Sequence, residues 1–251
     1  MNDPVIKVEG LTIGWDDNVL QENASFEIER GSVFAILGGS GCGKSTMLRH
    51  LVGLEETAAG GRITINGLAP TSDLVSPERP LFGVMFQSGA LLGSLTVGEN
   101  VALPLQEWTD LPPDAVGGLV AAKLRLVGLT RAEDKMPSEL SGGMSKRAAI
   151  ARAMALEPDL LFLDEPSAGL DPVSAAELDD LIVGLNRQLG LTFVVVTHDL
   201  ESIFKIAASC IMLDRESKSI IARGDPRLLR DGSDDPRVRS FFNRTPEEAK
   251  S

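Results

Sequence analysis

Three short runs of consecutive apolar residues organise the chain: Val33–Leu37, Leu160–Leu163 and Phe193–Val196. Unbroken apolar runs of this length are typical of strands that are buried on both faces, because alternation is expected only where one face meets water. Each run leads into a turn and then into a helical pattern, and this alternation of strands and helices is typical of a parallel α/β sheet. The hydrophobic pattern therefore predicts an α/β fold with a mainly parallel sheet.

The helix predicted after the first run begins at about Lys44. Its apolar residues recur at intervals of three and four, as on one face of an α-helix; they are Met47, Leu48, Leu51 and Val52. This spacing predicts a helix packed with one face against the core.

The region before Gly31 alternates between apolar and polar residues, which predicts a small antiparallel β subdomain near the N-terminus. Further along, the strand-like segment Arg62–Ile65 is followed by Asn66 and Gly67. An Asn-Gly pair suits the positive φ angles of a type I′ turn, so a hairpin is predicted here.

Helical segments follow between about 88 and 156, and Pro104, Pro112 and Pro113 are expected to mark boundaries between them. An alanine-rich helix is predicted over about Ser145–Leu156, ending before Pro158 because the residue before a proline disfavours helical geometry. We interpret this part as a helical subdomain inserted into the core.

The predicted plan is a single domain spanning residues 1–251. It comprises a core with its antiparallel β subdomain (about 1–87 and 157–225), the helical subdomain (about 88–156) and a polar tail (about 226–251). Phe241 and Phe242 are the only bulky apolar pair of that tail, and two alternatives remain for them: packing on their own domain or on a second protomer.

Charge and composition exclude some classes of function. The net charge of −12 argues against nucleic acid as a partner and against direct adsorption to an anionic membrane. We expect no secretory signal and no membrane span, because no apolar run approaches the roughly 20 residues that a span requires. Cys42 and Cys210 have no metal-like spacing, so a reducing compartment without a structural disulfide is expected.

The strongest local motif is Gly38–Ser45, which reads GGSGCGKS and matches the phosphate-binding pattern G-x-x-x-x-G-K-[ST]. Successive backbone N–H groups in such a loop form a concave anion site, and the following helix N-terminus adds partial positive charge. Lys44 would neutralise the β- and γ-phosphate oxygens, and the hydroxyl of Ser45 would bind Mg²⁺. Cys42 is interpreted as a small filler within the loop.

Two adjacent carboxylates follow the second apolar run. Asp164 is placed to bind the hydration shell of Mg²⁺, and Glu165 to polarise an attacking water as general base. The alternative for this pair is a simple capping role where the strand meets a loop. The phosphate-binding loop upstream favours the catalytic interpretation.

A second glycine-containing turn precedes the alanine-rich helix, about twenty residues before the acid pair. The serine hydroxyl of Ser141, followed by Gly142 and Gly143, predicts a helix N-terminus that binds an anion. An ordinary helix cap is the alternative.

Taken in order, GGSGCGKS, LSGGM, LFLDEP, SAGLD and VVVTHD closely resemble the nucleotide-binding subunit of an ABC transporter over nearly the whole chain. The resemblance implies a P-loop ATPase that acts as a head-to-tail homodimer with two ATP molecules at the interface. Ser141 and Gly143 would then contact the γ-phosphate bound by the other protomer.

The resemblance also assigns four single residues. Gln87 in VMFQ resembles the glutamine that senses Mg²⁺ and water, and His198 resembles the histidine that donates to the γ-phosphate. Trp15 stands where the family stacks an aromatic ring on adenine, and Asp171 resembles an acid that bridges protomers. The alternatives are a surface glutamine, a structural histidine, a core or hairpin tryptophan, and a helix-capping aspartate.

The implied site residues fall into three groups. The catalytic group is Glu165, His198 and Gln87; the Mg²⁺ group is Ser45, Gln87 and Asp164; the ATP-binding group is Trp15, Gly38, Gly39, Ser40, Gly41, Cys42, Gly43, Lys44, Ser45, Thr46, Ser141, Gly142 and Gly143.

Met144 departs from the glutamine usual at the end of the LSGG motif. With LTVGENVALPL, DPVSAAELDDL and THDLESIF, this departure makes the chain similar to the ATPases of Mla-type transporters, which are associated with mammalian-cell-entry (MCE) proteins and move phospholipids or related hydrophobic compounds. The resemblance implies a membrane permease that docks near Leu92–Leu105, an MCE-type lipid-binding subunit, and a peripheral location at the cytoplasmic face of the inner membrane. An ordinary solvated helix-loop segment is the alternative for Leu92–Leu105.

Three competing functions remain open from the sequence. They are the ATPase of an amino-acid, metal or other small-solute importer, an ABC-type ATPase that acts only as a scaffold or regulator, and a P-loop switch such as a GTPase. The LSGGM motif and Glu165 argue against the switch.

Overall fold

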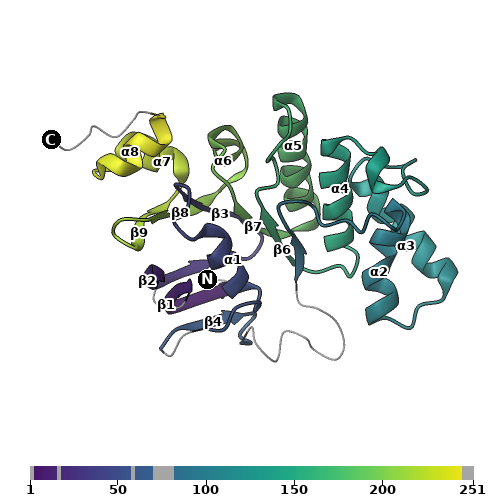
Figure 1. Cartoon of the computed structure of the whole chain (residues 1–251), viewed down its shortest axis with the longest axis horizontal. Coiled ribbons are helices and arrows are strands. Elements are labelled where there is room, and N and C mark those ends of the chain that lie inside the picture. Colours follow the sequence, from purple (N-terminus) through teal and green to yellow (C-terminus); the bar gives the residue numbers. More distant parts are fainter. Residues whose placement is uncertain (1–2, 16–17, 58–59, 70–81, 245–251) are drawn as a thin grey trace. The chain divides into compact units, whose positions relative to one another are not determined.

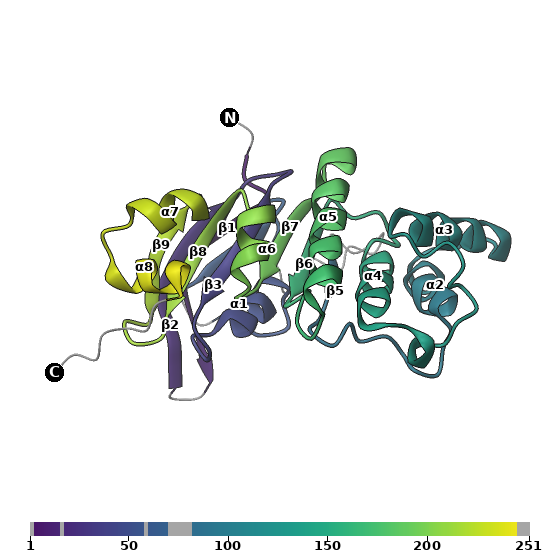
Figure 2. The same cartoon turned by 90° about the horizontal axis from the view of Figure 1, so that it is seen from above.

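The computed structural model describes residues 3–15, 18–57, 60–69 and 82–244. The chain divides into two compact units, one formed by Met1–Leu74 with Val195–Ser251 and the other by Val75–Val194. Each unit is described by itself below, with its elements labelled in Figures 1 and 2.

An antiparallel sheet of three strands lies in the first unit (Figure 1). Its order is β2-β1-β4, with β1 at Ile6–Trp15, β2 at Asn18–Ile28 and β4 at Arg62–Ile65. Buried and exposed side chains alternate at the start of β1, as the period of a strand with one wet face requires. The predicted antiparallel β subdomain is therefore confirmed.

The turn after β4 has the predicted geometry. Asn66 and Gly67 both have positive φ, 51° and 82°, and Ile65 and Leu68 exchange two backbone hydrogen bonds of 2.8 and 2.9 Å. Two consecutive positive φ angles define a type I′ turn, which Asn-Gly favours.

The remaining strands of the first unit form a mixed layer. β3 (Val33–Gly38) pairs in parallel with β8 (Ser209–Asp214), and β8 pairs antiparallel with β9 (Ser219–Gly224). Every residue of β3 is buried, which confirms the prediction for its apolar run. Helix α1 (Lys44–Leu51) contacts β1 and β3, so its apolar face is turned to the core as predicted.

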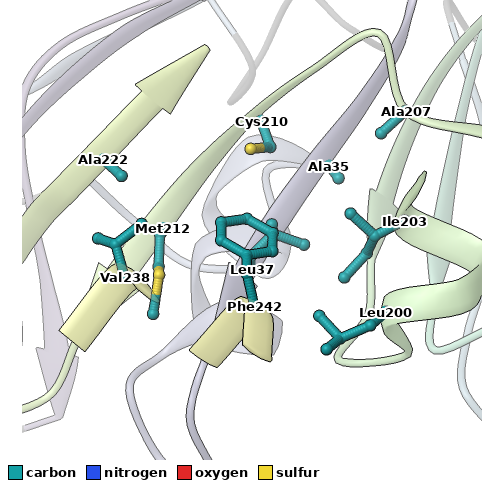
Figure 3. Packing of buried hydrophobic residues seen from close by; sticks show 10 residues of the cluster. All are labelled: Ala35, Leu37, Leu200, Ile203, Ala207, Cys210, Met212, Ala222, Val238 and Phe242. Carbon is teal, nitrogen blue, oxygen red and sulfur yellow. The ribbon is translucent and has the colours of Figure 1, made fainter. Parts of the chain in front are cut away.

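The C-terminal helices pack on this layer. α6 spans Leu200–Ile206, α7 Pro226–Gly232 and α8 Pro236–Asn243. Figure 3 shows Phe242 of α8 among Leu37 of β3, Met212 of β8 and Ile203 of α6. The Phe242 side chain is 3% exposed, and its ring centroid lies 5.7 Å from that of Phe204. Of the two alternatives for Phe242, packing on its own domain is therefore the one that the structure shows.

The second unit contains parallel strands and a group of helices. β5 (Gly83–Met85) pairs in parallel with β6 (Leu160–Asp164), and β7 (Thr192–Val196), whose first three residues belong to this unit, neighbours β6. Helices α2, α3 and α4 contact one another, as Figure 2 shows. The bounds of this unit's helices are Val97–Trp108 for α2, Pro113–Leu126 for α3, Pro137–Glu139 for the 3₁₀ helix, Gly142–Ala153 for α4 and Pro172–Leu189 for α5.

Two details of the helices differ from the prediction. Helix α4 begins at Gly142 and ends at Ala153, rather than spanning Ser145–Leu156, because Ser141 caps its first turn and the chain leaves helical geometry well before Pro158. Pro104 lies inside α2 instead of bounding a helix. Here the buried side of α2, including Val101 and Leu105, compensates for the one backbone hydrogen bond that a proline removes.

Among the described residues, no helix combines the length and the apolar character that crossing a membrane would require. Both cysteines, Cys42 and Cys210, are buried and free, in agreement with the predicted absence of a structural disulfide between them.

Candidate nucleotide site

The loop between β3 and α1 has a backbone that only glycine adopts easily. Gly38, Gly41 and Gly43 have φ angles of 145°, 74° and 102°. A Cβ atom at Gly38 would lie 2.4 Å from the carbonyl oxygen of Leu213, which is closer than any real contact. The glycines thus allow a concave turn directly before a helix N-terminus, which is the geometry predicted for a phosphate-binding loop.

The side chain of Lys44, at the end of this loop, binds two of the loop carbonyl groups. The ammonium of Lys44 donates to the carbonyl oxygens of Gly38 and Gly39 at 2.9 and 3.0 Å. Cys42 is fully buried, and burial raises the pKa of its thiol. The thiol is therefore protonated and unreactive, which agrees with a filling role inside the loop. Ser40 and Ser45 are exposed, whereas Thr46 is buried in α1.

Two further predicted residues lie in the same unit. Trp15 ends β1 opposite Asn18 and is 48% exposed, so it is a hairpin residue and not a core one. His198 is exposed and follows β7, immediately before Asp199, the residue that caps α6. The backbone beside it is fixed because Thr197 donates to the carbonyl of Ile36 and accepts from the N–H of Asp199.

The second unit contains the two carboxylates at the end of β6. Asp164 and Glu165 are each 8% exposed. Glu165 has a φ of 47°, a left-handed conformation that costs a non-glycine residue about 1–3 kcal/mol. Such strained residues cluster at active sites, because the surrounding structure must hold them there. Six other non-glycine residues of the described chain also have positive φ, so the catalytic role of Glu165 stays a prediction.

The LSGGM segment forms the exposed N-terminus of α4. The hydroxyl of Ser141 accepts from the N–H of Met144 at 3.3 Å, so Ser141 caps the helix as predicted. A Cβ atom at Gly142 would lie 3.1 Å from Leu170, and one at Gly143 would lie 3.4 Å from Ser174. Gly142 therefore allows this helix end to approach Leu170 closely, whereas a Cβ atom at Gly143 would meet Ser174 at an ordinary contact distance.

Asp171 caps that neighbouring helix. Its carboxylate accepts from the N–H groups of Val173 and Ser174, both at 3.1 Å, and from the Ser174 hydroxyl at 2.6 Å. The Ser174 hydroxyl and these N–H groups hold the pKa of Asp171 below its usual range. Capping is thus confirmed for Asp171, while the bridging of protomers stays a prediction.

Gln87 lies exposed in the turn after β5. Two residues that sequence reasoning missed hold this turn. The ammonium of Lys146 donates to the carbonyl of Gln87, and the guanidinium of Arg152 donates to those of Gly89 and Ala90 at 3.0 and 2.7 Å. Both cations belong to α4. The available signal was the presence of a lysine and an arginine on a helix otherwise rich in alanine.

Lys146 is also electrostatically linked to the acid pair. Its side chain is almost fully buried, and burial lowers the pKa of Lys146, while the charges of Asp164 and Glu165 act in the opposite direction. Helix α4 therefore connects the LSGGM turn, the backbone of Gln87 and the field of the two carboxylates within one unit.

The Mg²⁺ donors predicted from the sequence are hard oxygen atoms that lie in different units: the hydroxyl of Ser45 in the first, and the carboxylate of Asp164 and the amide oxygen of Gln87 in the second. No group of three or more His, Cys, Asp or Glu residues that could hold a metal occurs in the described part of the chain. Mg²⁺ commonly uses one or two carboxylates together with water and substrate phosphates, so this donor set is compatible with it.

Comparison with known proteins identifies the family. Residues 21–168 match the family model described as ABC transporter. The chain belongs to the ABC transporter family and is an ATPase of that family. The family match covers the P-loop, the LSGGM segment and the acid pair.

Curated relatives are similar over most of the chain. An intermembrane phospholipid transport system ATP-binding protein, MlaF, of Haemophilus influenzae is 41% identical, with 96% of this chain and 91% of the relative covered. MlaF of Escherichia coli is 44% identical, with 88% and 82% covered. A probable ribonucleotide transport ATP-binding protein, mkl, of Mycobacterium leprae is 40% identical, with 95% and 68% covered.

Solved structures confirm the fold class. CbiO1 of Clostridium perfringens, part of an ABC transporter complex, has a TM-score of 0.81 at 29% identity and covers 92% of each chain. The ATP-binding cassette MJ0796, described as a dimer in a post-hydrolysis state with ADP and phosphate, has a TM-score of 0.76 at 27% identity, with 88% of this chain and 98% of that chain covered. The predicted P-loop NTPase fold is therefore confirmed.

Proposed function

We propose that this ATPase powers the movement of phospholipid or related hydrophobic compounds across the cell envelope through a separate permease. The observation that carries the proposal is the similarity to two MlaF proteins, at 41 and 44% identity, over 91 and 82% of their length. Coverage of this length matters because the similarity extends well beyond the short phosphate-binding motifs themselves.

For ATP binding, we assign the phosphates to the glycine-rich loop and the adenine to the exposed ring of Trp15. Lys44, whose ammonium donates to the carbonyls of Gly38 and Gly39, neutralises the β- and γ-phosphate oxygens. Ser45, Asp164 and Gln87 hold Mg²⁺, directly or through its water shell. The metal, when bound, offsets the negative charge that develops on the phosphate oxygens.

For hydrolysis, we assign Glu165 as the general base that polarises the attacking water. His198 donates a hydrogen bond to the γ-phosphate, and Gln87 orients the water. Most of the rate enhancement then comes from positioning and charge stabilisation, as is usual for phosphoryl transfer. The burial of Glu165, which is 8% exposed at the end of β6, and its left-handed backbone are compatible with this assignment.

The proposed working unit is a head-to-tail homodimer with two ATP molecules at its interface. Ser141 and Gly143 contact the γ-phosphate held by the other protomer through the N-terminus of α4. This helix has 12 residues and an exposed start, which suits binding of an anion from outside the chain. The dimeric state named for the MJ0796 structure also supports this arrangement.

The proposed location is the cytoplasmic face of the inner membrane, where the protein is held by its partners. The permease docks near residues 92–105, where Leu92 and Leu103 are 46 and 38% exposed. An MCE-type lipid-binding subunit completes the proposed system, and no nucleic acid takes part.

A pull-down from gently solubilised native membranes tests the cargo, with mass spectrometry of both proteins and lipids. We expect a multispanning permease, a single-pass MCE-type subunit and bound phospholipid. A permease with a soluble solute-binding protein would instead indicate a nutrient importer, and a bound ribonucleotide would follow the name of the mkl relatives. Recovery of no membrane partner would favour a scaffold.

A further inference from the structure

Gln21 is a fully buried polar residue of β2 that the mechanism so far does not use. Its side-chain amide nitrogen donates to two main-chain carbonyls, each at 2.9 Å. One belongs to Cys42 in the glycine-rich loop, and the other belongs to Asp214 at the end of β8. All three residues lie in the same compact unit.

The contact with Cys42 has a consequence for the next residue of the loop. A trans peptide is planar, and its C=O and N–H groups point in opposite directions. When Gln21 holds the carbonyl of Cys42, it also fixes the direction of the Gly43 N–H, which therefore points away from β2. Gly43 has a φ of 102° and precedes the first turn of α1, so its peptide would otherwise have wide freedom to rotate.

The carbonyls of the loop are thus held by two different side chains. Lys44 binds those of Gly38 and Gly39, and Gln21 binds that of Cys42. An anion site made of N–H groups requires the carbonyl oxygens to point elsewhere, because an oxygen turned inward would repel a phosphate.

A glutamine at this position has a visible cost. Its side-chain oxygen is buried and has no hydrogen-bond partner among the described residues. A methionine of similar shape would fill the same space without burying an unpaired acceptor. The two donated hydrogen bonds therefore explain the residue better than space filling does.

We infer that Gln21 is a positioning residue for nucleotide binding, which sets the peptide between Cys42 and Gly43 so that the loop presents its N–H groups to phosphate. The inference rests on the proposed phosphate-binding role of the loop. Through Asp214, whose carboxylate accepts from Arg237 at 2.8 Å, the same amide also links the loop to helix α8.

Titration calorimetry with MgADP tests the inference on the full chain, since ADP engages the loop without hydrolysis. Four variants are compared with the wild type. Gln21→Met removes both donors at nearly constant volume, and Gln21→Glu makes the donor dependent on pH. Glu22→Gln, at the exposed neighbouring position, is the matched control, and Lys44→Ala is the reference for loss of phosphate binding.

We expect Gln21→Met to weaken MgADP binding about tenfold and Glu22→Gln to leave it unchanged. Burial raises the pKa of a carboxyl group, so the group introduced by Gln21→Glu is protonated at about pH 6, where it donates one hydrogen bond, and charged at about pH 8, where it donates none. Relative to the wild type at the same pH, Gln21→Glu should therefore bind MgADP more tightly at the lower pH, while Gln21→Met should show no such recovery.

Two results would overturn the inference. If Gln21→Met binds MgADP like the wild type while Lys44→Ala loses binding, the loop binds phosphate and Gln21 merely packs. If both Gln21 variants lose affinity equally at every pH, in proportion to a lowered melting temperature, Gln21 is structural only. Unchanged binding by Lys44→Ala would instead refute the proposed role of the loop itself.

Discussion

The glycine-rich loop and the turn at Gln87 are held in place by different means. The loop depends on backbone angles that only glycine adopts easily and on hydrogen bonds from a neutral amide and one lysine. The turn at Gln87 is held by two long cationic side chains of α4, Lys146 and Arg152. A substitution at a loop glycine should therefore distort the main chain of the loop. At the turn, removing the Lys146 or Arg152 side chain should be enough to release the main chain.

The largest effect is expected at Glu165, which belongs neither to the glycine-rich loop nor to the contacts that hold the turn at Gln87. Glu165→Gln keeps the shape of the side chain and removes the general base, so ATP hydrolysis should fall by about 10²–10⁴-fold with MgATP binding retained. Phosphate release measures ATP hydrolysis, and light scattering with MgATP measures whether the ATP-bound dimer forms. A variant that hydrolyses ATP normally would refute the assigned base, and one that binds MgATP yet stays monomeric would refute the ATP-bound dimer.

The backbone side of the comparison is tested at two neighbouring glycines. Gly38→Ala places a Cβ atom 2.4 Å from the Leu213 carbonyl at a φ of 145°, so it should lower the melting temperature and weaken MgADP binding by at least about tenfold. Gly39→Ala is the control for stability alone, because its Cβ atom would meet nothing within 4 Å. Equal melting temperatures for the two variants would show that the close approach at Gly38 is tolerated.

The side-chain system is tested by Lys146→Met. This change removes the donor to the Gln87 carbonyl, so kcat for ATP hydrolysis should fall about tenfold while MgADP affinity stays unchanged. Arg147→Met is the matched control on the same helix, because Arg147 forms only a partly exposed ion pair with Glu177. If Lys146→Met weakens MgADP binding as well, the contacts that hold the turn at Gln87 and those that hold the glycine-rich loop are not independent.

The smallest effect is a dependence on pH. His50 lies buried in α1, five residues after Ser45, the last residue of the glycine-rich loop. Burial lowers the pKa of His50, against the opposing effect of Glu55. A lowered pKa in the folded state means that the unfolded chain takes up the proton first. The stability associated with neutral His50 is therefore present above about pH 6.5 and is lost as the pH falls towards the lowered pKa.

His50→Leu should remove this dependence. Urea unfolding at about pH 7.5 and about pH 5.5 should show the wild type losing more stability than the variant on acidification. Because His50 belongs to the unit that contains the loop, the loss should appear in that unit. Equal losses in both proteins would show that His50 does not contribute to the acid sensitivity.

Much of the fold was predictable because its signals are local. The apolar runs at β3, β6 and β7 need no distant partner to be recognised as buried strands, and Asn66-Gly67 encodes its own turn. The candidate residues were predictable for the same reason: glycines, a lysine and paired acids at fixed spacing carry phosphate chemistry in the sequence itself. The roles assigned to all of these residues, and to Gln87, His198 and Trp15, remain predictions.

Helix boundaries were less predictable. Sequence periodicity placed the start of α4 three residues late, since Ser141 was recognised as a cap but Gly142 and Gly143 are poor helix formers in isolation. A Cβ atom at Gly142 would lie 3.1 Å from Leu170, so the small size of Gly142 lets this helix end pack closely there. Tertiary packing overrode local propensity at this point, as it did for Pro104 inside α2.

The sequence by itself therefore determined the family and the order of the elements and supplied the candidate residues for phosphate chemistry, because each of these depends on neighbours along the chain. Only the tertiary structure decided what holds them. Gln21 reaches Asp214 across 193 positions of sequence, and Lys146 reaches Gln87 across 59. Contacts of such separation arise from the folding of the chain, and no local pattern of hydrophobic and polar residues encodes which distant carbonyl a buried donor will meet.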